Sequence, residues 1–249
     1  MPNNEIALDL LRTFGKPIAA PSANKFGHVS PTKAEHVYKD FYQDSTVLII
    51  DGGSCSFGIE STVLKVTTES RPSDSEHSPD SMVFFNLLIL RKGGISLENL
   101  LETVRDLGIA DRAELQQVAK KHFKSEDENL EAPGQFLRHY SPDIVSYLFT
   151  GVDAITRPGV ALENAVVIDF AATFASLQPE AKYYYDLSPE GDFIQAISRV
   201  YDVLRWAETK SDASCVLIIH LLELSDRFDG AGKEHMEALF DRLFRATSG

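Results

Sequence analysis

Residues 188–222 read SPEGDFIQAISRVYDVLRWAETKSDASCVLIIHLL, and this stretch predicts a helix followed by a strand. Between residues 193 and 204, apolar side chains recur every three or four positions, which is the spacing of one buried helix face. We expect Ser188 to cap this helix, because Pro189 then occupies its first position. Residues 214–222 form a short apolar run, which is typical of a buried strand. A helix that leads into such a strand is the repeating unit of an α/β sheet.

The same two patterns recur along the rest of the chain. Runs of apolar and β-branched residues predict further strands, at residues 18–21, 46–51, 61–66, 83–90, 145–149 and 165–170. Apolar residues at helical spacing predict further helices, at residues 6–11, 32–41, 97–107 and 236–244. Thr32 and Ser96 have side chains suited to cap two of these helices. Because strands alternate with helices, we expect an α/β protein built on a parallel, helix-covered sheet.

Composition divides the chain into two parts. Residues 67–81 contain no aliphatic or aromatic side chain, and such a segment cannot offset the entropy lost on ordering, so we expect a disordered surface insertion there. The charged stretch that begins at residue 120 is broken by Pro133-Gly134 and has no periodic pattern. We therefore expect one domain over residues 1–119, a linker over 120–144 and an α/β C-terminal domain over 145–249.

The chain is acidic, with 24 Lys and Arg against 37 Asp and Glu and a net charge of −13. This balance disfavours broad binding to RNA or to an anionic membrane, yet it still allows a local pocket for a small anion. Cys55 and Cys215 form neither a metal motif nor a disulfide framework, which favours a reducing compartment. With no apolar run long enough for a membrane span and no visible secretory signal, we expect a cytoplasmic protein.

No P-loop, G-x-G-x-x-G, H-E-x-x-H or G-x-S-x-G motif occurs in the sequence, so the informative residues are polar ones at predicted strand ends. PSAN at 21–24 follows one predicted strand and leads through SPT at 30–32 into a helix. Donors in such a place can hold a phosphate or a carboxylate. The alternative is a loop in which Ser22 and Asn24 satisfy only the local backbone.

Two further motifs lie at predicted strand ends. GIESTV at 58–63 enters a strand and contains Ser61, and ILRKGG at 89–94 ends a strand and contains Arg91. The carboxyl end of a strand is the usual ligand side of an open α/β sheet, so Arg91 is a candidate ligand contact. The alternative is an ordinary surface arginine.

These motifs, followed by APGQFLRHYSP at 132–142, resemble in their order the YrdC-like threonylcarbamoyl-AMP synthases, in the long form that carries a second domain. The resemblance is close over residues 1 to about 145, and Asp241-Arg242-Leu243 near the end resembles the close of that family's C-terminal domain. It implies a partial YrdC-like twisted-sheet domain followed by a small Rossmann-like α/β domain.

The resemblance also implies a reaction. The family condenses L-threonine, bicarbonate and ATP into threonylcarbamoyl-AMP and pyrophosphate, with Mg²⁺ as the expected helper ion. The product passes to a separate transferase complex that modifies an adenosine in tRNA. Direct tRNA binding by this acidic chain is expected to be weak. The alternatives are a non-catalytic YrdC-like module that binds nucleotide or RNA, and a generic nucleotide-binding C-terminal domain.

Individual residues receive implied roles by matching the family's motifs. Those implied to contact ATP are Ser22, Asn24, Ser30, Arg91 and Tyr140. Those implied to contact L-threonine are Ser22 and Ser61. His139-Tyr140 matches a linker motif that folds over the cleft as a lid, and simple docking of the linker onto the domain is the alternative. We assign no catalytic nucleophile. We also assign no metal ligand, because the remaining histidines, His28 among them, lack metal-ligand spacing.

The sequence also departs from the family. Family members have an upstream segment with a Lys/Arg-rich motif and strands that bind threonine and triphosphate, and residues 1–249 contain no match to it. We therefore expect residues 1–119 to be the C-terminal portion of the catalytic domain, with apolar sheet edges left exposed. An inactive fragment is the alternative to a working enzyme.

Overall fold

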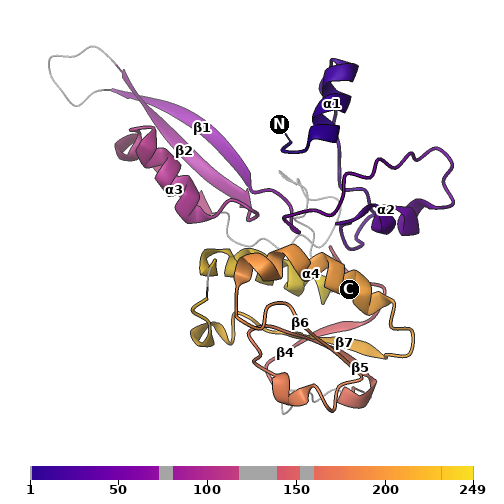
Figure 1. Cartoon of the computed structure of the whole chain (residues 1–249). Helices are drawn as coiled ribbons and strands as arrows, with labels where there is room; N and C mark the ends of the chain where they lie inside the picture. The colour runs from indigo at the N-terminus through magenta and orange to yellow at the C-terminus, as the bar shows by residue number, and fades with distance from the viewer. Residues whose placement is uncertain (1, 73–80, 118–138, 152–159, 231, 249) are drawn as a thin grey trace.

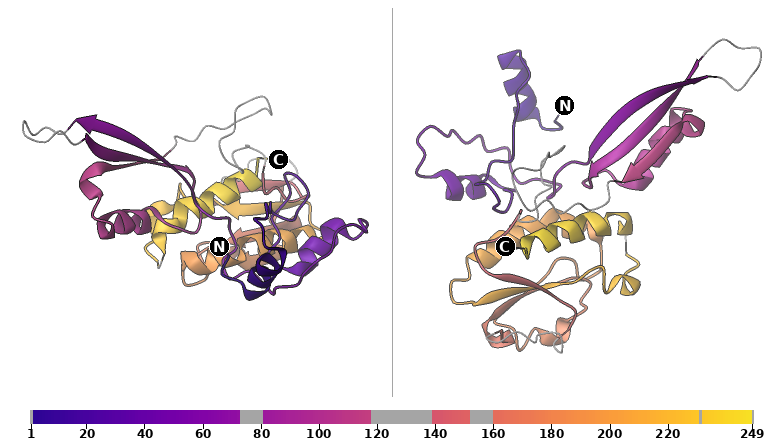
Figure 2. Two further views of the ribbon diagram at one scale, coloured as in Figure 1. Left: turned by 90° about the horizontal axis from the view of Figure 1, so that it is seen from above. Right: turned by 180° about the vertical axis from the view of Figure 1, so that it is seen from behind.

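The computed structural model describes residues 2–72, 81–117, 139–151, 160–230 and 232–248. Within these residues the strands form two sheets, one of three strands and one of four. The four-stranded sheet lies near the C-terminus and carries the longest helix, while the three-stranded sheet projects away from it (Figures 1 and 2). Helices and strands therefore mix throughout the molecule, and the predicted α/β class is confirmed.

The C-terminal sheet is parallel throughout. Its strands lie in the order β4 (Ser146–Phe149), β7 (Cys215–Ile219), β5 (Ala165–Asp169) and β6 (Tyr183–Asp186). Every residue of the two central strands is buried, as their apolar composition predicts. Helices α4 (Phe193–Glu208) and α5 (Met236–Ala246) lie side by side over one face of the sheet (Figure 1). This is the helix-covered parallel sheet expected from the sequence.

Helix α4 begins later than predicted. Its cap is Asp192, whose carboxylate accepts hydrogen bonds from the backbone N–H groups of Ile194 and Gln195. Gly191 has a φ of 76°, so the chain turns sharply just before the helix. Ser188 lies in that turn, where its hydroxyl accepts from the Asp192 N–H, and the prediction that Ser188 caps the helix is wrong. The predicted apolar stripe is fully buried, as expected.

The second sheet has the order β1–β2–β3. Strands β1 (Val63–Pro72) and β2 (Ser81–Arg91) are antiparallel, and β3 (Ala113–Gln117) pairs parallel with β2. The predicted disordered insertion at 67–81 is therefore wrong for 67–72 and for residue 81, because ladder pairing orders these residues whatever their composition. Residues 73–80 lie outside the described residues. Helix α3 (Leu97–Asp106) accompanies this sheet, and Ser96 caps it in a reciprocal capping box with Asn99, as predicted for Ser96.

The N-terminal region is mostly irregular. Helix α1 (Glu5–Phe14) and helix α2 (Ala34–Phe41) form, but α2 is preceded by Lys33, which makes no side-chain capping bond, so Thr32 is not its cap. The strands predicted at 18–21 and 46–51 are absent from the described residues, and Leu48 is 91% exposed. A strand needs a neighbour for its backbone groups, and no described segment pairs with these two. They remain unpaired apolar segments.

Part of the N-terminal half packs on the C-terminal helices. Val29, Ile59 and Tyr140 belong to the same buried apolar cluster as α4, α5 and the parallel sheet. A backbone bridge joins His28 to Ser141. Within the described chain, no helix has both the length and the apolar character needed to cross a bilayer. The predicted division into 1–119, 120–144 and 145–249 stays a prediction, because most of the linker lies outside the described residues.

Candidate functional site

Glu60, from the GIESTV motif, is the centre of a hydrogen-bond group that joins distant segments. Its Oε1 accepts a hydrogen bond of 2.8 Å from the Ser30 hydroxyl. The Tyr201 hydroxyl lies 3.1 and 2.9 Å from the two Glu60 oxygens, and Arg242 Nε donates to Oε2 at 3.2 Å. Ser30 belongs to the SPT motif, Tyr201 to α4 and Arg242 to α5. The group therefore links two sequence motifs to both C-terminal helices.

The ion pair between Glu60 and Arg242 is largely shielded from solvent. The Arg242 side chain is fully buried and that of Glu60 is 17% exposed. Burial opposes ionisation of Glu60, but Arg242 and the hydroxyl of Ser30 outweigh it and hold the pKa of the carboxyl below its usual value. Both groups are therefore charged near neutral pH, and loss of either would leave a buried charge without its partner.

Tyr140 lies against this group. It is 1% exposed, its ring stacks on Tyr201 with centroids 5.3 Å apart, and the Arg242 guanidinium lies 5.6 Å from its ring centre. Burial raises the pKa of Tyr140 to about 12, so its hydroxyl is neutral. Tyr140 also has a φ of 61°, a conformation that costs free energy outside glycine and that its packing must stabilise. Tyr140 thus anchors the last part of the predicted linker.

His139 lies beside Tyr140, with ring centroids 4.1 Å apart, and its ring edge faces Phe26. Burial lowers the pKa of His139, and Glu60 opposes this shift. Three guanidinium groups lower that pKa further, those of Arg245, Arg242 and Arg91. The imidazole is therefore neutral near pH 7, with one carboxylate and three guanidinium groups close enough to influence it.

Two buried nitrogen atoms in this group have no hydrogen-bond partner among the described residues, Nδ1 of His139 and Nη2 of Arg242. Buried polar atoms normally have partners, and each exception calls for an explanation. These two nitrogens therefore keep hydrogen-bonding capacity that no described residue uses.

Ser61, just before β1, and Arg91, at the end of β2, lie in contact with each other. Arg91 Nε donates to the Ser61 carbonyl at 3.1 Å, and Nη2 lies 3.4 Å from the Ser61 hydroxyl. Gly93 permits this close approach, because a Cβ atom there would collide with the backbone of Glu60 and Ser61. The KGG loop and the GIESTV motif are therefore packed directly against each other.

Ser22 and Asn24 make local contacts. The Asn24 amide donates to the carbonyls of Lys25 and His28 at 2.9 and 3.0 Å, and its backbone N–H donates to the Ser22 carbonyl. Ser22 is exposed. These are the backbone contacts that the alternative interpretation of the motif describes, and no contact between described residues joins Ser22 or Asn24 to the Glu60 group. Their roles in ligand binding stay predictions.

A cavity of about 490 Å³ lies between the end of β2 and the start of α5. It is lined by Thr62, Ser96 and His235, among others, and by the ion pair of Lys92 with Glu237. None of the predicted contact residues is among its described lining residues. The residues that sequence reasoning missed are Glu60, Tyr201 and Arg242. Glu60 and Arg242 lie within motifs that match the family, but they contact each other across 182 residues of sequence, so no local signal points to the pair.

Models of known protein families match both halves of the chain. A family model described as "Telomere recombination" matches residues 1–74, and one described as "Threonylcarbamoyl-AMP synthase, C-terminal domain" matches residues 95–248. Threonylcarbamoyl-AMP synthases of Schizosaccharomyces pombe and Pyrococcus abyssi are 38% and 39% identical over 64% and 57% of this chain. Each of these matches covers 34% of the relative, so the chain spans about a third of the length of the curated relatives it matches.

Solved structures agree. The crystal structure of P. abyssi Sua5 complexed with L-threonine aligns with 99% of this chain and 62% of its own, with a TM-score of 0.64 and 26% identity. A variant of P. abyssi Sua5 with adjacent histidine and tyrosine residues replaced by alanine aligns with a TM-score of 0.63, 28% identity and coverage of 99% and 61%. With a family model matching more than half of its length, the chain belongs to the threonylcarbamoyl-AMP synthase family.

Proposed function

We propose that this chain serves the synthesis of threonylcarbamoyl-AMP and pyrophosphate from L-threonine, bicarbonate and ATP, as a nucleotidyltransferase. Family membership supports the proposal, but the observation that carries it is the convergence at the Glu60 group. Ser30, Arg91 and Tyr140, all expected to contact ATP, lie in or beside this group, and Ser61, expected to contact threonine, bonds to Arg91.

Adenylation requires the protein to position the reactants and to stabilise negative charge on the phosphoryl oxygens. In adenylation, an oxygen of threonylcarbamate attacks the α-phosphorus of ATP and pyrophosphate leaves, so no covalent protein nucleophile is needed. Negative charge grows on the phosphoryl oxygens, and preorganised guanidinium groups stabilise it. We assign this role to Arg91, the arginine that the family resemblance implies to contact ATP.

Mg²⁺ would neutralise the leaving pyrophosphate when bound. The carboxylate at the centre of the group, that of Glu60, already accepts from Ser30, Tyr201 and Arg242 and has little capacity left for a cation. The described side chains here thus offer arginines in place of a magnesium ligand set, and we propose that the nucleotide's own phosphates carry the ion.

We propose that His139-Tyr140 anchors a cover over the site. Threonylcarbamate is labile in water, so a segment that excludes solvent has a chemical purpose. The pair is the one adjacent His–Tyr in this sequence, and the P. abyssi Sua5 variant carries its double alanine substitution at an adjacent histidine and tyrosine. Burial of Tyr140 against Tyr201 supports an anchor at the end of the linker.

A non-catalytic nucleotide-binding module is the second candidate. It is favoured by the local bonding of Ser22 and Asn24 and by the absence of the predicted contact residues from the described lining of the 490 Å³ cavity. In the enzymatic case, the product would go to a tRNA-modifying transferase complex. The free thiols of Cys55 and Cys215 agree with the cytoplasm as the proposed location.

Pyrophosphate release separates the two candidates. The proposal expects release that depends on both L-threonine and bicarbonate and that falls strongly in Arg91→Ala, while Arg71→Ala, at an exposed ion pair, retains it. ATP binding by calorimetry without any threonine-dependent pyrophosphate release would instead identify a binding module. Release that persists without L-threonine would overturn the proposed substrate.

A further inference from the structure

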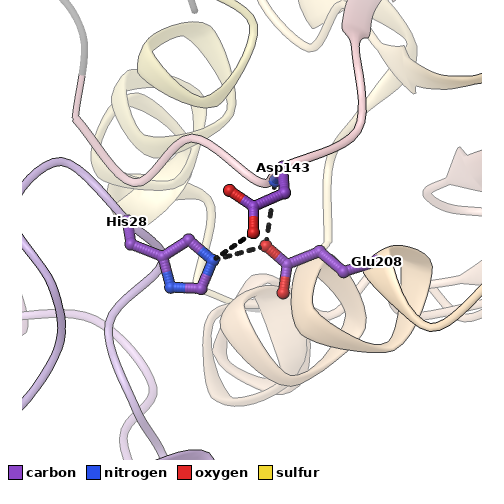
Figure 3. Close-up of side chains that lie close together, drawn as sticks. All are labelled: His28, Asp143 and Glu208. Carbon is purple, nitrogen blue, oxygen red and sulfur yellow. Dashed lines mark hydrogen bonds and ion pairs between the residues drawn. The ribbon is translucent and has the colours of Figure 1, made fainter. Parts of the chain in front are cut away.

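Three potential metal ligands from distant parts of the chain meet at one place away from the Glu60 group (Figure 3). They are His28, Asp143, which lies just before β4, and Glu208, the last residue of α4. His28 Nε2 lies 2.7 Å from Glu208 Oε1 and 3.8 Å from Asp143 Oδ2. The ligand atoms of all three lie within 4.8 Å of one another. Imidazole and carboxylate groups so placed are a common donor set for a divalent cation.

The backbone holds these ligands in place. The Asp143 N–H donates to Glu208 Oε1 at 3.1 Å, which fixes that carboxylate relative to the chain after the linker. The bridge between His28 and Ser141, with the Ser141 N–H donating to the Gly27 carbonyl, fixes the same chain relative to the imidazole. A ligand set held from both sides needs little reorganisation when an ion binds.

A second carboxylate lies near the far nitrogen of the imidazole, although no hydrogen bond joins the two. Asp40 Oδ2 lies 3.5 Å from His28 Nδ1, and Arg205 pairs with Asp40 at 2.7 Å. A carboxylate on the far nitrogen favours the proton there and leaves the Nε2 lone pair for a metal, an arrangement that recurs at zinc sites. In the absence of an ion, His28 Nε2 and Glu208 Oε1 form a hydrogen bond of 2.7 Å, so a metal would bind in place of the proton that this bond shares.

One oxygen of the Glu208 carboxylate keeps capacity for a further ligand. Arg205 neutralises Asp40, but the Glu208 side chain is only 4% exposed and its Oε2 has no hydrogen-bond partner among the described residues. The nearest described ammonium group, on Lys39, is 3.6 Å from that oxygen and 54% exposed. Asp143 is 90% exposed, so its side chain can turn toward the ion from the solvent side.

We propose that His28, Asp143 and Glu208 bind one Zn²⁺ ion, with water in the remaining position. Metal–ligand bonds of about 2.1 Å in tetrahedral geometry separate ligand atoms by about 3.4 Å. The observed 2.7 and 3.8 Å lie on either side of that spacing, so sub-ångström shifts of the side chains complete the site. The ion would link Asp143 to His28 in the N-terminal half and to Glu208 at the end of α4. Its binding is independent of the proposed enzymatic function.

The test is Zn²⁺ titration of the full chain, after removal of metals by a chelator, followed by calorimetry and by thermal unfolding with and without the ion. We expect one Zn²⁺ per chain and a higher unfolding temperature when it is bound. Asp143→Asn, at an exposed position that leaves the fold intact, should weaken binding at least about tenfold. Glu208→Gln should weaken it further.

Glu223→Gln is the matched control, because Glu223 lies 3.3 Å from His220 outside the proposed site. It should bind Zn²⁺ like the parent chain. Binding that is absent, or that Asp143→Asn and Glu223→Gln change equally, would overturn the proposal and leave His28 as a protonated partner of Glu208. Co²⁺ gives a second readout, since its visible absorption in a His-containing site should vanish in Asp143→Asn and Glu208→Gln.

Discussion

Replacing Glu60 by glutamine should destabilise the chain by about 3 kcal/mol, because it leaves the Arg242 guanidinium buried without a counter-charge. Removing one partner of a buried ion pair usually costs about 3–5 kcal/mol. The lower end applies here, since Glu60 is 17% exposed and glutamine can still accept the hydrogen bonds of Ser30 and Tyr201. The loss should appear in the free energy of unfolding in urea.

Trp206 provides the assay, because it is the one tryptophan of the chain and lies in α4, the helix that also carries Tyr201. Its fluorescence therefore reports unfolding of the element on which the Glu60 group is built. Glu69→Gln is the control, at an exposed pair with Arg71 whose side chains are 54% and 53% exposed. An exposed pair of this kind contributes less than about 1 kcal/mol.

A double-mutant cycle sharpens the result. Arg242→Met alone removes the cation, and the double variant Glu60→Gln/Arg242→Met removes the unpartnered charge that makes each single change costly. The double variant should lose at least about 1 kcal/mol less than the sum of the two single losses. Equal losses for Glu60→Gln and Glu69→Gln, or additivity in the cycle, would refute the reasoning.

The same contacts support three further predictions. Gly93→Ala should cost at least about 1 kcal/mol, because the new methyl group collides with the backbone of Glu60, whereas Gly52→Ala meets only a side chain and should cost less in the same thermal unfolding experiment. The pKa of Glu60 lies below its usual 4.5, so the stability from its ionised form is complete above that pH and is lost as the pH falls through the lower folded value. As the pH falls below 4.5, the free energy of unfolding should thus decrease less steeply for Glu60→Gln than for the parent chain. The same pH dependence in both proteins would contradict this assignment. Asp192→Ala should cost about 1 kcal/mol by removing the cap of α4, and an unchanged urea midpoint of Trp206 fluorescence would argue against that cap.

Local signals in the sequence predicted part of the local structure, although the caps expected at Ser188 and Thr32 were wrong. The cap at Ser96 and the buried stripe of α4 both depend on residues within a few turns of each other, and both are confirmed. Strands were predicted less accurately, because an apolar run such as 46–51 becomes a strand only when another strand pairs with it. Strand β3, with the sequence AELQQ, was missed because its polar side chains give no apolar pattern and pairing with β2 alone orders it.

The candidate site shows the same division. The motifs that contain Ser30, Ser61 and Arg91 were visible in the sequence, but the contact between Glu60 and Arg242 spans 182 residues and has no local signal. The proposed zinc ligands are equally dispersed, with 180 residues between His28 and Glu208. Spacing rules for metal motifs detect ligands on one loop or helix, so they could not find this set.

The central claim is that the motifs of the N-terminal half and α5 form one nucleotide site. Photocrosslinking with 8-azido-ATP, followed by mass spectrometry of the labelled peptides, tests it most directly. We predict label on peptides that contain Ser30, Arg91 or His139-Tyr140, and competition of that label by unmodified ATP. Label confined to the loops after β5 and β7 would contradict this account and would place nucleotide binding in the C-terminal sheet.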